Sequence, residues 1–136
     1  MRILLVDDTP QIAELLSFAL RDHGYEVAAA GFDPEICDLV AAHRPAALVL
    51  DCTSFDMAEM LFDAVRAREE YAALPIVIVS DTPEIADRSL QRRAAEHVLL
   101  IPKPFTAGQI ARALAELLER PASLPNQSLL TNPPNP

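Results

Sequence analysis

Side chains with catalytic potential follow four apolar runs of this sequence, at the point where each run ends. They are Asp7 and Asp8 after ILLV, Asp51 after ALVL, Ser80 after PIVIV and Lys103 after VLLIP. Carboxylates that lie close together repel one another unless a cation neutralises them, and Mg²⁺ suits oxygen ligands of this kind. A metal ion, a carboxylate nucleophile, a lysine and a hydroxyl together indicate phosphoryl transfer through an aspartyl-phosphate.

Lys103 is the only lysine in the chain, whose other cationic side chains are all arginine. A compact ammonium suits a phosphoryl oxygen beside a metal ion better than the broad guanidinium fork of arginine. Lys103 lies between two prolines, and a residue that precedes proline favours extended backbone. The Lys103–Pro104 bond is also a candidate cis peptide. Both features would fix the direction of the ammonium group.

The elements that must position these side chains alternate between strand and helix patterns. Continuous apolar runs predict strands that are covered on both faces, and apolar residues at helical spacing predict the helices between them. The expected strands are residues 3–6, 25–30, 46–50, 75–80 and 98–101. Five helices are expected between and after these strands. The first carries the apolar stripe Ile12, Leu15, Leu16, Ala19 and Leu20, and the second is capped by Asp33 and ends before Pro45. The third and fourth cover residues 56–71 and 83–95, and the last begins with the capping box Thr106–Gln109.

This order predicts an α/β fold, namely a flavodoxin-like five-stranded parallel sheet of order 2-1-3-4-5 with helices on both faces. Ligands of such sheets bind beyond the carboxyl ends of the strands, where the winding reverses between the first and third strands. The three aspartates should therefore meet there. We expect one domain over residues 1–120 and a disordered tail over residues 121–136, which are rich in proline and asparagine and hold no charged side chain.

The composition excludes several classes of function. A net charge of −9 argues against a nucleic-acid binder, and we interpret the basic cluster of Arg88, Arg92 and Arg93 as a solvated helix face. No apolar run is long enough to span a membrane, and no signal peptide is evident, so we expect a cytoplasmic location. Cys37 and Cys52 are predicted to be reduced thiols that neither form a disulfide nor bind zinc.

Taken together, these residues resemble the receiver domain of two-component response regulators. The resemblance rests on Asp7-Asp8, Asp51, Ser80 and Lys103-Pro104-Phe105, which occur in the family's order and at close to its usual spacing. It implies that Asp51 accepts a phosphoryl group from a phosphohistidine on a sensor histidine kinase or a phosphotransfer protein. It also implies that Asp8, Asp51 and the main-chain carbonyl of Thr53 bind Mg²⁺ directly, with Asp7 acting largely through a bound water.

For the remaining site residues the resemblance implies a switch. Lys103 would pair with Asp51 and then with the phosphoryl oxygens. Ser80 would move toward the phosphoryl group and transmit the change to the fourth helix. The protein would then be a signalling domain in a phosphorelay rather than an enzyme, and its only catalysis would be its own phosphorylation and dephosphorylation.

Four positions depart from the pattern of the family. Phe55 and Glu59 stand where a proline and a glycine are usual, which implies a different loop before the third helix. Asp81 replaces a small residue after Ser80 and adds negative charge at the mouth of the site. Leu100 stands where an aromatic switch residue is common, so an aromatic rotation cannot report the phosphorylated state.

Two functional classes therefore remain open. The first is a phosphorylated, Mg²⁺-dependent receiver, expected to stand alone as a monomer or weak homodimer and to act on an unknown protein target. The second is a pseudo-receiver that serves as a phosphorylation-independent protein-interaction module, which Phe55, Asp81 and Leu100 favour. A phosphatase of the aspartyl-phosphate type is a weaker alternative, since it would need a D-x-D pattern where this chain has Asp7-Asp8-Thr9.

Overall fold

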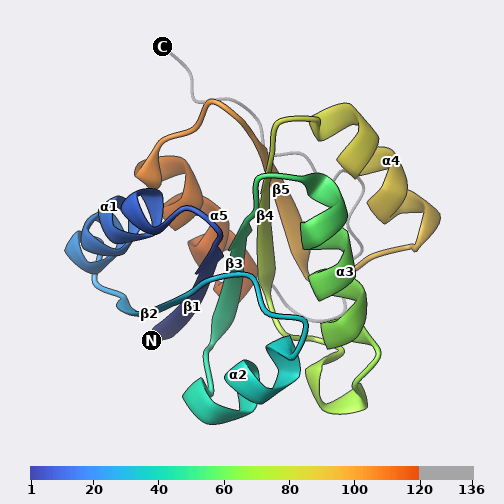
Figure 1. Ribbon diagram of the computed structural model, residues 1–136, viewed down its shortest axis with the longest axis horizontal. Coiled ribbons are helices and arrows are strands. Elements are labelled where there is room, and N and C mark those ends of the chain that lie inside the picture. The colour runs from blue at the N-terminus through green and yellow to red at the C-terminus, as the bar shows by residue number, and fades with distance from the viewer. Residues whose placement is uncertain (120–136) are drawn as a thin grey trace.

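A computed structural model describes residues 1–119 of the chain, so the predicted tail over residues 121–136 lies outside the described residues. Five parallel strands form one sheet in the order β2-β1-β3-β4-β5 (Figure 1), which confirms the predicted fold. The strands are β1 (Arg2–Asp7), β2 (Glu26–Ala30), β3 (Ala47–Asp51), β4 (Ile76–Ser80) and β5 (Val98–Pro102). The helices are α1 (Pro10–Asp22), α2 (Ile36–His43), α3 (Phe55–Arg66), the 3₁₀ turn η1 (Glu69–Tyr71), α4 (Pro83–Arg92) and α5 (Ala107–Glu119).

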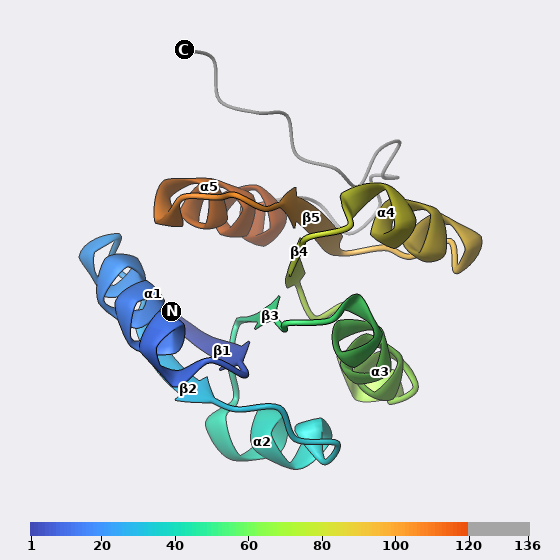
Figure 2. The same ribbon diagram turned by 45° about the horizontal axis from the view of Figure 1, so that its top comes forward.

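The helices cover both faces of the sheet, as the continuous apolar strands require. α1 and α5 lie on one face, and α2, α3 and α4 lie on the other (Figure 2). Alternate strand residues supply the two cores: Leu4 and Leu48 face α2 and α3, whereas Ile3 and Leu5 face α1 and α5. Because both faces are covered, the inner strands can expose polar groups only at their ends.

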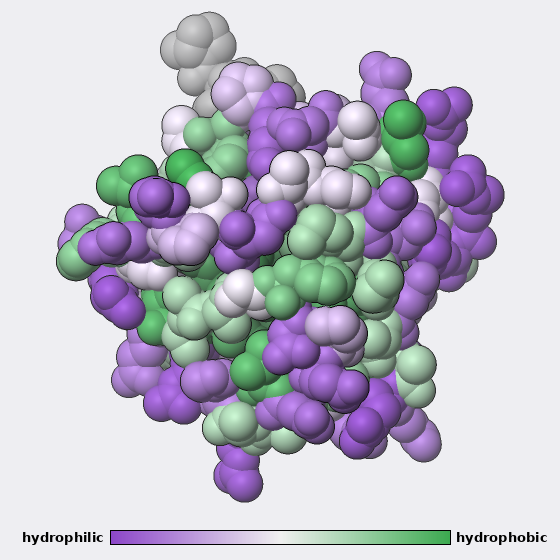
Figure 3. Space-filling model, in the orientation of Figure 1, coloured by the Kyte–Doolittle hydropathy of each residue, from purple (hydrophilic) through white to green (hydrophobic). Residues whose placement is uncertain are grey.

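The outer surface differs between helices, since Leu15 and Phe18 of α1 are exposed apolar side chains. Figure 3 shows hydrophilic residues over the outer side of α4 and smaller hydrophobic patches between them. No helix among residues 1–119 is long and apolar enough to cross a bilayer.

Two helix caps show how local sequence fixes the ends of elements. The predicted capping box is present in front of α5, where the amide of Thr106 donates to Gln109 Oε1 at 2.7 Å and the amide of Gln109 donates to Thr106 Oγ1 at 3.2 Å. The sequence analysis did not identify the cap of α3, which is Ser54, whose hydroxyl accepts from the amide of Asp56 at 3.1 Å. This cap sets where the chain leaves the end of β3 and enters α3.

Three predicted helix features were wrong. Asp33 does not cap α2, because its carboxylate closes a turn with the amide of Glu35 at 2.9 Å and the helix begins only at Ile36. The helix expected over residues 56–71 ends at Arg66, whose guanidinium donates to the carbonyl of Tyr71 at 2.8 Å and so holds the separate turn η1 against it.

The buried face of α1 is also rotated from the predicted stripe. Its buried residues are Ala13, Leu16, Ser17 and Leu20, whereas Ile12 is 39% exposed and Leu15 is 66% exposed. The helix carries apolar residues on two faces, and only one of them packs against the sheet.

Candidate functional site

The parallel register brings the predicted residues to one edge of the sheet. β1 pairs with β3 so that Asp7 lies opposite Asp51, and β4 pairs with β5 so that Ser80 lies opposite Pro102. The amide of Lys103 also donates to the carbonyl of Ser80 at 2.9 Å, which ties the start of the β5–α5 connection to the end of β4. The strand ends thus place these side chains as the alternating pattern predicted.

A cavity of about 240 Å³ opens at this edge. Its lining includes five of the predicted site residues and three residues that were not predicted. They are Asp7, Asp8, Asp51, Thr53 and Lys103, with Thr9, Ile12 and Phe105. The cavity is therefore lined by three carboxylates and one ammonium group, with two apolar side chains.

Lys103 and Asp51 form an ion pair inside this cavity. Lys103 Nζ lies 3.1 Å from Asp51 Oδ1, and the Asp51 side chain is only 4% exposed. Burial alone would lower the pKa of Lys103, but the hydrogen bond and the charge of Asp51 outweigh it and raise that pKa. The Lys103–Pro104 peptide bond is cis, as its sequence suggested. Lys103 is thus a protonated cation directed at the carboxylate that would act as the nucleophile.

Asp7 lacks full compensation for its charge. Its Oδ1 accepts from the amide of Thr9 at 2.8 Å, while its Oδ2 is buried and has no hydrogen-bond partner among residues 1–119. The pKa of Asp7 is raised to about 6, mainly by burial and also by the charge of Asp51, while the hydrogen bond from Thr9 opposes this rise. A carboxylate with an orphaned oxygen beside a second carboxylate is a place where a hard cation would be stabilising.

The predicted metal ligands are not assembled as a ready-made group. Both oxygens of Asp8 accept from the amide of Thr53, at 3.0 and 3.2 Å. Within residues 1–119, no three side chains of histidine, cysteine, aspartate or glutamate converge as a metal-binding group. Asp8 is therefore held to the Thr53 amide rather than directed at Asp7 and Asp51. The donor chemistry still fits Mg²⁺, which needs only one or two carboxylates and retains several waters.

Ser80 lies beside this cavity rather than in its lining. It is 3% exposed, and its hydroxyl accepts from the amide of Thr82 at 3.0 Å. Its oxygen also lies 3.4 Å from the Thr82 hydroxyl. The Ser80 hydroxyl is therefore turned toward the β4–α4 connection.

The positions that depart from the family pattern have distinct surroundings. Phe55 is the first residue of α3 and packs partly buried against the core on that face of the sheet. Asp81 is exposed, and its charge contributes to raising the pKa of Lys103. Leu100 is fully buried in the same core. Glu59 accepts a hydrogen bond from Ser89, so it joins α3 to α4.

Three residues of the cavity were missed by the sequence analysis. Ile12 was assigned to a buried stripe, Thr9 was used only to exclude a D-x-D pattern, and Phe105 was noted only for the resemblance. The position of Thr9 directly after Asp7-Asp8, and of Phe105 just after Lys103, could have placed both at the same edge of the sheet. Ile12 gave no such signal.

Cys52 follows Asp51 but points to the other side. Its side chain belongs to the core shared with α3, and burial raises the pKa of its thiol to about 12. Cys37 and Cys52 are both free thiols, as predicted. At neutral pH Cys52 is therefore an inert buried group beside the site.

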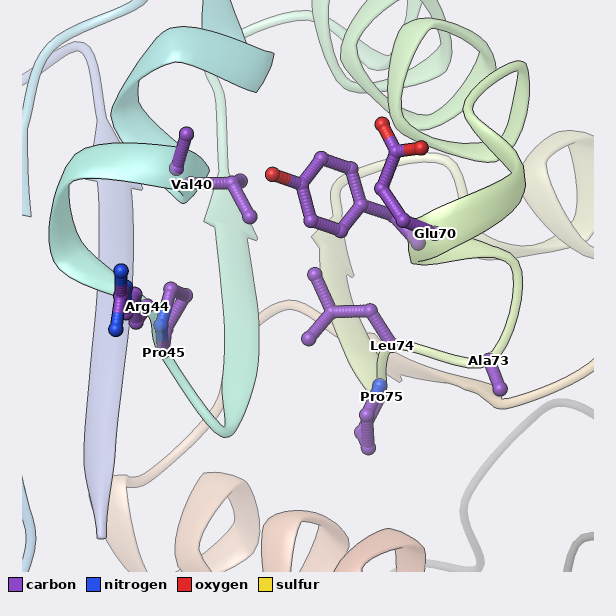
Figure 4. A pocket seen from close by; sticks show the side chains of 9 residues that line it. Val40, Arg44, Pro45, Glu70, Ala73, Leu74 and Pro75 are labelled. Atoms are coloured by element: carbon purple, nitrogen blue, oxygen red, sulfur yellow. The ribbon is translucent and has the colours of Figure 1, made fainter.

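A second cavity, of about 630 Å³, opens at the opposite edge of the sheet between α2 and η1. Tyr71 is part of its lining, and Figure 4 shows Val40 and Leu74 around it, with Arg44 and Glu70 on separate sides. It contains none of the predicted site residues. The predicted site residues therefore lie in the smaller of these two cavities.

The chain matches the family model for the response regulator receiver domain over residues 3–115. Among curated proteins it is similar to the response regulator MprA of Mycobacterium avium, with 32% identity over 122 residues, 88% of this chain and 52% of that protein. It is also similar to the probable transcriptional regulatory protein TcrX of Mycobacterium tuberculosis, with 30% identity over 87% of this chain and 50% of that protein. The chain thus spans about half the length of the curated relatives it matches.

Solved structures agree with the fold. The receiver domain of NtrX from Brucella abortus superposes with a TM-score of 0.70 at 27% identity, covering 86% of this chain and 98% of that one. The receiver domain of the sensor histidine kinase PA1611 from Pseudomonas aeruginosa has a TM-score of 0.67 at 23% identity, covering 88% and 98% of the two chains. That structure has a magnesium ion coordinated in its active site cleft.

Proposed function

The chain belongs to the response regulator receiver domain family, and on that premise we propose that Asp51 accepts a phosphoryl group from a phosphohistidine on a sensor histidine kinase or a phosphotransfer protein. The observation that carries this proposal is the ion pair between Lys103 Nζ and Asp51 Oδ1, 3.1 Å apart in an otherwise acidic cavity. The donor's phosphoryl group needs both a carboxylate nucleophile and a positive charge beside its oxygens, and this pair supplies both.

In the proposed reaction, a carboxylate oxygen of Asp51 forms a bond to phosphorus while the bond from phosphorus to the donor imidazole nitrogen breaks. The electron pair of that bond stays on the imidazole nitrogen, and the ring leaves as a neutral imidazole because its other nitrogen carries a proton. The Asp51 carboxylate is already ionised, so the reaction needs no base from this chain. The ammonium of Lys103 then moves its hydrogen bond from Asp51 to a phosphoryl oxygen. Because the Asp51 side chain is 4% exposed, little water competes with the donor for the nucleophile.

Asp7, Asp8, Asp51 and the main-chain carbonyl of Thr53 would hold Mg²⁺ in this proposal. When bound, the ion would neutralise the carboxylates and the charge on the phosphoryl oxygens. The Oδ2 of Asp7, which has no partner among residues 1–119, and the three carboxylates that share the cavity with the single ammonium of Lys103 support this assignment. Asp8 would exchange its bonds to the Thr53 amide for the ion.

The proposed outcome of phosphorylation is a conformational switch. Ser80 would give up its bond from the Thr82 amide and donate its hydroxyl to a phosphoryl oxygen on Asp51. Only Asp81 and Thr82 separate Ser80 from the first residue of α4, so this movement would reach that helix. Because Leu100 is a fully buried aliphatic residue, the switch would proceed without an aromatic rotation at that position.

A phosphoryl mimic separates this proposal from a phosphorylation-independent interaction module. We would titrate the protein with beryllofluoride in the presence of Mg²⁺ and follow backbone amide resonances by NMR. A switch predicts saturable shifts at residues 51–54 and 80–82, and their loss in Asp51→Asn. A spectrum that stays unchanged at saturating mimic would favour the interaction module.

A further inference from the structure

A cluster of polar and charged side chains joins α3 to α4. Arg93, at the end of α4, makes a two-pronged contact with Asp63 of α3, with Nε–Oδ1 at 2.8 Å and Nη2–Oδ2 at 3.0 Å. The same guanidinium lies 3.4 Å from Glu59 and donates to the carbonyl of Ser89 at 3.1 Å. We call Glu59, Asp63, Ser89 and Arg93 the α3–α4 clasp.

The clasp is built from two matching helical turns. Glu59 and Asp63 are four residues apart on α3, and Ser89 of α4 lies four residues before Arg93, the C-cap of that helix, so each pair lies on one helical face. Ser89 is 1% exposed, and its hydroxyl donates to Glu59 while it accepts from Arg93. A buried polar group with both roles filled is costly to separate from its partners. This corrects the interpretation of Arg93 as part of a solvated face.

The two helices in the clasp lead directly from the two loops of the proposed site. α3 begins four residues after Asp51, and α4 begins three residues after Ser80. The carbonyl of Thr82 accepts from the amide of Ala86 at 3.0 Å, so the short β4–α4 connection is bonded into the first turn of α4. A displacement of Ser80 is therefore passed to α4 rather than absorbed by a loop.

From these contacts we infer that Glu59, Asp63 and Arg93 are positioning residues that hold α4 against α3 in the unphosphorylated protein and oppose the movement of Ser80 toward Asp51. The inference rests on the proposed function. The clasp bonds are complete in this structure, in which Ser80 is bonded to Thr82. They stabilise this arrangement over any arrangement in which α4 shifts along α3. By reciprocity, a phosphoryl mimic that shifts α4 must weaken the clasp, and loss of the clasp must strengthen binding of the mimic.

The test is the affinity for beryllofluoride in saturating Mg²⁺, measured by calorimetry on the full chain. Arg93→Gln and the milder Asp63→Asn should each bind the mimic more tightly, by about fivefold or more. The double variant should gain no more than the larger single effect, because both changes remove the same contact. Affinity for Mg²⁺ without the mimic should not change, since none of these residues lines the cavity.

Arg92→Gln is the matched control, because it removes the same charge one position earlier on α4 and Arg92 makes no ion pair to another described residue. It should leave both affinities unchanged. Clasp variants that bind the mimic as the wild type does, or more weakly, would overturn the inference while leaving the proposed function intact. A wild-type protein that fails to bind the mimic would overturn the proposed function, and the clasp inference with it.

Discussion

Asp7 and Asp51 lie opposite each other in the register of two neighbouring parallel strands, at the edge where both strands end. Asp7 is 3% exposed, and one of its oxygens has no hydrogen-bond partner in the part of the chain that the structure describes. The pair is held together by the sheet, not by its own interaction, which is repulsive when both groups are ionised. The repulsion between these two carboxylates therefore destabilises the folded protein, and a bound cation would reduce that repulsion.

The first prediction concerns Asp7 in the protein without metal. Asp7→Asn should raise the free energy of unfolding at pH 7.5 by about 1–3 kcal/mol, because it removes a buried negative charge from beside Asp51. The pKa of Asp7 is raised from 3.8 to about 6 in the folded state, so the folded protein binds the proton more tightly than the unfolded chain. This contribution to stability is therefore present at pH 4 and is lost as the pH rises toward and through 6.

Urea unfolding in a chelator at pH 5 and at pH 7.5 would test this. The gain from Asp7→Asn should be larger at pH 7.5 than at pH 5. Glu14→Gln, on the exposed side of α1, serves as the control for loss of one acidic group. A variant less stable than the wild type at pH 7.5 would show that Asp7 is not under electrostatic strain.

The second prediction concerns Mg²⁺ itself. Since the ion would bind the folded protein and not the unfolded chain, it should raise the free energy of unfolding by about 2–3 kcal/mol at a hundredfold excess over its Kd. Asp51→Asn should reduce this gain, because it removes a charged ligand. Thermal unfolding over a series of Mg²⁺ concentrations measures the effect. An equal shift in wild type and Asp51→Asn would place the ion elsewhere.

The third prediction concerns the cation of the site. Lys103→Ala should slow phosphorylation by acetyl phosphate by about 100-fold or more, because it removes the charge that meets the phosphoryl oxygens. Lys103→Arg should restore little of the rate, since a guanidinium fork cannot take the place of a compact ammonium between Asp51 and a metal ion. Arg112→Ala, on the exposed side of α5, is the control. A Lys103→Arg variant as fast as the wild type would contradict the role assigned to the ammonium.

The fourth prediction concerns Asp81 at the mouth of the site. Asp81→Asn should increase the rate of phosphorylation by acetyl phosphate a few-fold at low ionic strength, because it removes repulsion of an anionic donor. The gain should shrink as salt is added, since Asp81 is exposed and its field is screened. Rates measured at two salt concentrations would test this. A gain that does not depend on salt would point to a local structural effect instead.

The order of the sheet and the location of the site could be predicted from the sequence because both depend on the order and the ends of the apolar strands. Asp7, Asp51 and Ser80 each end a fully buried run, and parallel strands bring such ends to one edge. The pairing of Lys103 with Asp51 was instead implied by the resemblance to receiver domains, although the position of Lys103 directly after β5 already indicated the same edge of the sheet. The capping box of α5 could also be predicted, because Thr106 and Gln109 have the residue types and the spacing of that motif.

Other features depend on contacts between distant residues, which periodicity cannot reveal. Arg93 meets Asp63 across thirty positions of sequence, so its place in a clasp was not visible in the basic cluster. Ile12 belongs to one of two apolar faces of α1, and helical spacing alone does not say which face is buried. The bonds of Asp8 to the Thr53 amide likewise join residues of two different loops.

The central claim is that Asp51 is phosphorylated in a reaction that needs Mg²⁺. The most direct measurement is the intact mass of the protein after incubation with acetyl phosphate and Mg²⁺, with Asp51→Asn and an excess of chelator as parallel samples. The account predicts an added phosphoryl group that is labile to base and absent from both parallel samples. An adduct that persists in Asp51→Asn, or a wild-type protein that binds Mg²⁺ and gains no mass with either acetyl phosphate or a phosphohistidine donor, would contradict it.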